Sequence, residues 1–79
     1  MNTNDSIAVG SGLSVGLAFG AGVLIGQGMS PGKASMIAYV SAVTEMRHSD
    51  YDYLDFDENF VLDMLKNTRQ FIIEKSAVC

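Results

Sequence analysis

The chain has 79 residues, five basic and nine acidic side chains, and a formal net charge of −4. Its size allows one small domain at most and argues against an arrangement of several domains. The acidic balance argues against binding to nucleic acid or to anionic membranes. The single cysteine, Cys79, forms no disulfide within the chain, which is compatible with a reducing compartment.

The N-terminal third combines abundant glycine with an absence of charge. Residues 6–32 carry no charged side chain and hold all eight glycines. The run Ile7–Gly26 is 20 residues long, about the length that crosses the hydrocarbon core of a bilayer. Three of its glycines recur at four-residue spacing, which lets helices approach closely in lipid: Gly12, Gly16 and Gly20. One interpretation is therefore a membrane-spanning helix over residues 7–28.

A second periodicity in the same segment favours a strand followed by a turn. From Ile7 to Ile25 the bulky apolar residues occupy almost only odd positions, and strict alternation is typical of a strand. A run this long needs a break, and Gly10-Ser11-Gly12 supplies the backbone freedom for a tight turn. We therefore expect a short strand over Ser6–Gly10, this turn, and a buried helix over Leu13–Gly26.

The middle of the chain predicts a helix and a second strand. Ser30 and Pro31 form a helix start, with serine as the N-cap and proline at the first helical position. Apolar residues follow at helical spacing, so a helix is expected from Pro31 to Met46. Residues 51–56 alternate aromatic or aliphatic side chains with acidic ones, which is typical of a short strand with one solvated face.

The end of the chain predicts a last, amphipathic helix. Asp55 followed by Glu58 resembles a capping box, with aspartate in the role of serine. The residues expected to face inward on this helix are apolar and recur at helical spacing: Phe60, Val61, Met64, Leu65, Phe71 and Ile72.

The segment Asn4–Gly12 resembles the strand and Gly-Ser-Gly turn in the second half of proteasome-type subunits. The likeness is to the bacterial proteasome-like peptidase that works with an ATPase unfoldase. In that family a helix follows the turn, and a short break separates it from a second helix. Met29-Ser30-Pro31 stands at a similar distance in sequence from the Gly-Ser-Gly turn of this chain. The resemblance covers about residues 4–57. It implies an α+β fold, with a fragment of the proteasome-like sandwich over residues 1–56 and a C-terminal amphipathic helix over residues 57–79.

The resemblance also limits the chemistry that we expect. The family is similar to other N-terminal nucleophile hydrolases, in which a threonine at the chain start attacks the peptide bond, assisted by a lysine and an acid. This chain has no counterpart of the half that carries them, so no threonine-type peptidase activity is expected from it alone. The resemblance carries over only Ser11, in a supporting role, with Asp50 as the stand-in for a later acid. No cofactor or metal is expected.

Three functions are compatible with these patterns. The preferred one is a non-catalytic or split proteasome-like protein of the cytoplasm, which associates with itself or with a partner that supplies the missing sheet. Its expected interface lies on the glycine-rich helix and the last helix, at Gly16, Gly20, Val61, Leu65 and Ile72. The first alternative is a single-span protein of the inner membrane that oligomerises through its glycine-rich helix. The second is a soluble acidic inhibitor that occupies a partner's surface.

Overall fold

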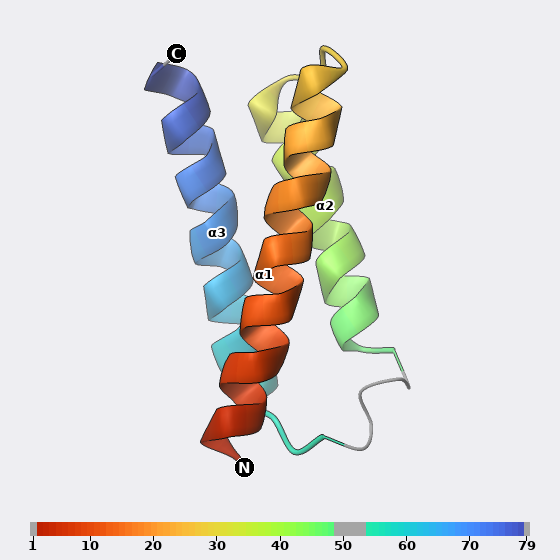
Figure 1. The fold of residues 1–79 in the computed structure, drawn as a ribbon, viewed down its shortest axis with the longest axis vertical. Coiled ribbons are helices and arrows are strands. Elements are labelled where there is room, and N and C mark those ends of the chain that lie inside the picture. Colours follow the sequence, from red (N-terminus) through yellow and green to blue (C-terminus); the bar gives the residue numbers. More distant parts are fainter. Residues whose placement is uncertain (1, 49–53, 79) are drawn as a thin grey trace.

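The protein is a bundle of three helices in a computed structural model that describes residues 2–48 and 54–78. The helices are α1 (Thr3–Gly26), α2 (Pro31–Met46) and α3 (Glu58–Val78). Figure 1 shows that α2 runs antiparallel to α1, whereas α3 runs parallel to it. Every pair of helices is in contact, and the bundle measures 39 × 21 × 14 Å.

The structure corrects the expected α+β fold. α1 runs from Thr3 to Gly26 without a break, so the strand over Ser6–Gly10 and the turn at Gly10-Ser11-Gly12 are wrong. No strand occurs anywhere in residues 2–48 or 54–78. Because the proteasome-like sandwich is built from sheets, the resemblance to that family and to the N-terminal nucleophile hydrolase fold is wrong as well.

Most odd-numbered apolar residues of α1 fall into two series, each based on a four-residue step. The first series is buried: Val9, Leu13, Leu17 and Ala21. The second series is 44% to 75% exposed and is interrupted by Ser11: Ile7, Val15, Phe19 and Val23. A step of four residues fits both a strand of period two and a helix of period 3.6. The alternation of bulky and small residues along the sequence therefore arises from two rows of apolar side chains on one helix, one buried and one exposed.

The predicted helix from Pro31 to Met46 is confirmed as α2. The Ser30 hydroxyl accepts a hydrogen bond from the backbone N–H of Lys33 at 3.4 Å, as an N-cap residue does. The last helix is present as α3, but its cap differs from the prediction. The carboxylate of Asp57, rather than that of Asp55, accepts the backbone N–H of Asn59 at 3.0 Å.

The predicted second strand falls partly outside the described residues, which exclude 51–53 and Asp50. Leu54, Asp55 and Phe56 are described and belong to no strand. Leu54 and Phe56 instead pack their side chains against the core of the bundle. In this irregular segment the apolar side chains Leu54 and Phe56 therefore point toward the core, and Asp55 between them is exposed.

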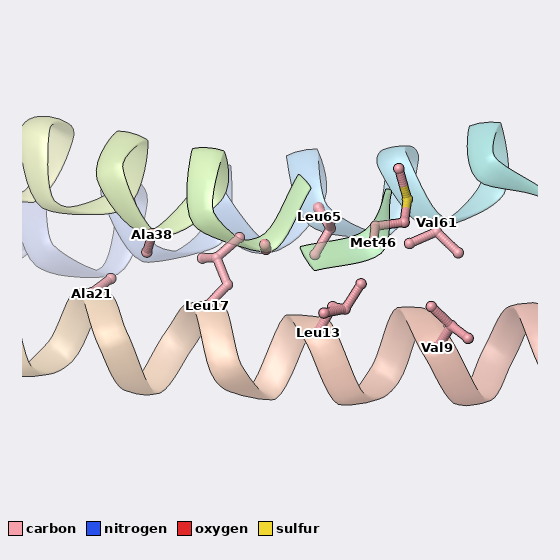
Figure 2. Close-up of a cluster of buried hydrophobic side chains, with 9 residues drawn as sticks. Val9, Leu13, Leu17, Ala21, Ala38, Met46, Val61 and Leu65 are labelled. Carbon is pink, nitrogen blue, oxygen red and sulfur yellow. The ribbon is translucent and has the colours of Figure 1, made fainter. Parts of the chain in front are cut away.

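The core lies along the line where the three helices meet. Figure 2 shows side chains of α1 pointing at α2 and α3, and Leu65 of α3 is completely buried. The core cluster holds nine buried residues from all three helices: Val9, Leu13, Leu17, Ala21, Ala38, Ala42, Met46, Val61 and Leu65. Small side chains on α2 let that helix approach α1, whereas α3 contributes larger ones.

Hydrogen bonds tie the start of α1 to the segment that precedes α3. The backbone N–H of Asn2 donates to the Asp55 carbonyl at 2.8 Å, and the N–H of Asp55 donates to the carboxylate of Asp5 at 3.2 Å. The N–H of Asp57 donates to the buried hydroxyl of Ser6 at 2.8 Å. We call these three bonds the N-terminal clasp. It closes the bundle between residues about 50 positions apart in sequence.

Candidate functional site

The exposed surface of α1 is apolar, both beside the groove that it forms with α2 and on the side away from α2 and α3. Phe19 is 75% exposed and Val15 is 70% exposed, which are the highest values among the exposed large apolar residues. Most other exposed residues of α1 are small: Ala8, Ser11, Gly12, Gly16, Ala18, Gly22 and Gly26. No charged residue lies on α1 beyond Asp5. A solvated helix face in a soluble domain is normally polar, so this surface of α1 is unusual.

Most glycines of α1 are not required by the packing of the bundle. A Cβ atom added at Gly12, Gly16, Gly22 or Gly26 would meet nothing within 4 Å. Gly10 is the contrasting case, because a Cβ there would collide with the sulfur of Met64 on α3. Each glycine in a helix interior costs about 1 kcal/mol relative to alanine. The open glycines therefore reduce helix stability without any gain within the chain itself.

A groove of about 600 Å³ runs between α1 and α2 beside two of these glycines, Gly12 and Gly16. Its floor includes Gly20, at which an added Cβ would lie 3.9 Å from the Cβ of Ala38. We call the exposed surface around the groove the hairpin face, defined by Gly12, Gly16, Phe19, Val23, Ile37 and Ser41. The adjoining α2 residues Met36 and Val40 are also 43% and 53% exposed, so the apolar surface continues onto α2.

Charge is distributed unevenly between this hairpin and the remainder of the chain. From Ser6 to Met46 the only charged residues are Lys33 and Glu45, which have opposite signs. The stretch from Ser6 to Met46 is therefore neutral, and the net charge of −4 comes entirely from other parts of the chain, including Asp5 at the start of α1. The charged side chains of α3 include Lys66 and Glu74, which are exposed. The molecule thus combines a hairpin that is neutral from Ser6 to Met46 with a charged third helix.

The structure distributes the predicted interface residues over different environments. Gly16 is exposed and Gly20 is half-buried, and both line the groove. Val61 and Leu65 are completely buried inside the bundle, and Ile72 is half-buried against its core. These three α3 residues already cover apolar surface of this chain.

Two further predictions on α1 and α3 have clear structural outcomes. Ser11 is exposed on α1, outside any turn, so the family resemblance that gave it a supporting role no longer applies. Phe60 and Phe71 were expected to face inward but are 40% and 58% exposed. The Nζ atom of Lys75 lies 5.5 Å from the centre of the Phe71 ring, which gives this aromatic side chain a cation–π contact at the surface.

Sequence reasoning missed the residues that make the hairpin face apolar. Phe19 and Val23 were assigned to a buried helix, whereas they are 75% and 44% exposed, and Ile37 of α2, for which no exposure was predicted, is 42% exposed. A helical projection of residues 3–26 carries the missing signal. It puts Val9, Leu13 and Leu17 on one side and leaves Val15 and Phe19 on another, with no charge to mark that side as solvated.

Three further observations bear on the chemistry of the chain. Among the described residues, no group of three His, Cys, Asp or Glu side chains is placed to hold a metal ion. α1 is long and apolar enough to cross a membrane by length and composition, a criterion that core helices of soluble proteins and signal sequences also meet. Comparison with protein-family models, curated proteins and solved structures found no match for the chain.

Proposed function

We propose that this protein acts by association, and that its hairpin face packs against a helical surface of another protein chain in the cytoplasm. The observation that carries this proposal is the set of open glycines on α1. Gly12 and Gly16 line the groove, and neither has a neighbour within 4 Å of an added Cβ. Glycine at such positions lets a second helix approach closely, which explains residues that the bundle itself does not need.

Burial of the apolar residues supplies the driving force for this association. Complete burial of a large apolar side chain is worth about 1.5–3 kcal/mol. Because Phe19 is 75% exposed, covering its ring would contribute about 1–2 kcal/mol on that scale. Val23 and Ile37 would add smaller amounts, since more than half of each is already covered. The absence of charge on α1 beyond Asp5 removes the desolvation penalty that opposes such burial.

Substitution of two glycines on the same helix tests the proposal. Gly16→Leu places a side chain in the groove, whereas Gly22→Leu places the same side chain on α1 outside the groove. Neither position has a neighbour within 4 Å, so both variants are expected to keep the bundle and its helical circular dichroism. In light scattering without detergent we expect Gly16→Leu to lose the assembly and Gly22→Leu to keep it. A monomeric wild-type protein, or identical behaviour of the two variants, would contradict the proposal.

A second candidate function is favoured by the low burial of α1. Only 28% of its most apolar stretch is buried inside the structure, although a core helix of a soluble protein is mostly buried. We propose as the alternative that α1 enters a membrane and oligomerises there. Val15 and Gly22 support it, because both are exposed and lie outside the groove. In that state α1 would separate from α3, whose charged residues cannot accompany it into the hydrocarbon core.

Fractionation distinguishes the two candidates. The association proposal expects the full chain in the soluble fraction without detergent. The membrane alternative expects it in the membrane fraction, resistant to extraction with alkaline carbonate, and floating with phospholipid vesicles.

A further inference from the structure

We draw no further inference here: the strongest candidate, the apolar hairpin face around the groove between α1 and α2, carries nothing beyond the association already proposed, because nothing in the part of the chain that the structure describes shows what covers it.

Discussion

Leu65 is the side chain whose removal tests the three-helix bundle most directly. It is completely buried on α3 and belongs to the cluster that includes Leu13 and Leu17 of α1. Truncation of a buried leucine to alanine costs about 2–5 kcal/mol. A chain of 79 residues is expected to have a total stability of about 4–12 kcal/mol. Leu65→Ala should therefore remove a large fraction of the stability and lower the melting temperature by more than about 10 °C.

The measurement is urea denaturation followed by circular dichroism at one fixed protein concentration, because association would add a concentration-dependent term. Leu62→Ala is the matched control, since Leu62 lies on the same helix but is only partly buried against the core. We expect it to cost clearly less than Leu65→Ala. Equal losses from the two variants, or a loss below about 1 kcal/mol for Leu65→Ala, would show that α3 does not pack on α1 as described.

Three smaller predictions concern the caps and contacts of the bundle. Asp57→Ala should destabilise α3 by about 1 kcal/mol through loss of its N-cap, as measured by the same urea titration. Ser6→Ala leaves the N–H of Asp57 without its partner at 2.8 Å and should cost about 1–3 kcal/mol, whereas the exposed Ser11→Ala should be nearly neutral. Gly10→Leu should lower the melting temperature because its side chain collides with Met64. Gly22→Leu should raise the melting temperature or leave it unchanged. A lower melting temperature for Gly22→Leu than for Gly10→Leu would contradict the contact between α1 and α3 at Gly10.

The sequence was sufficient for those elements whose ends are marked by local chemistry. At the start of α2, the Ser30 side chain accepts a hydrogen bond from a backbone N–H group that has no partner within the helix, and the ring of Pro31 fixes a helical φ angle. Neither effect depends on the tertiary fold, so α2 was predicted with its correct ends. The start of α3 was predicted to within one residue, but its cap was assigned to Asp55 instead of Asp57 because both have side chains suited to capping. Only the fold decides between them, since it uses the backbone of Asp55 to bind the start of α1.

The fold class was not predictable in the same way, because α1 carries two periodicities at once. Val9, Leu13 and Leu17 follow a four-residue step that a helix and a strand share, and the glycines around Ser11 favour a turn over a helix on propensity alone. Tertiary packing decides the outcome, as α2 and α3 bury that line of side chains. The exposure of Phe19 was missed because the helix that carries it was predicted to be buried, whereas glycines such as Gly16 prove to be open.

The N-terminal clasp has a consequence for the order in which the chain can fold. Its bonds join Asp5 to Asp55 and Ser6 to Asp57, so they form only after about two thirds of the chain has been synthesised. α1 and α2 are joined by a short connection and can pair early, whereas α3 must close a loop of about 50 residues before it covers Leu13 and its neighbours. Until then the side of α1 that α3 covers stays open, even when α2 is already in place. An incomplete bundle of α1 and α2 therefore exposes part of its own core, including Leu13, until α3 packs against it.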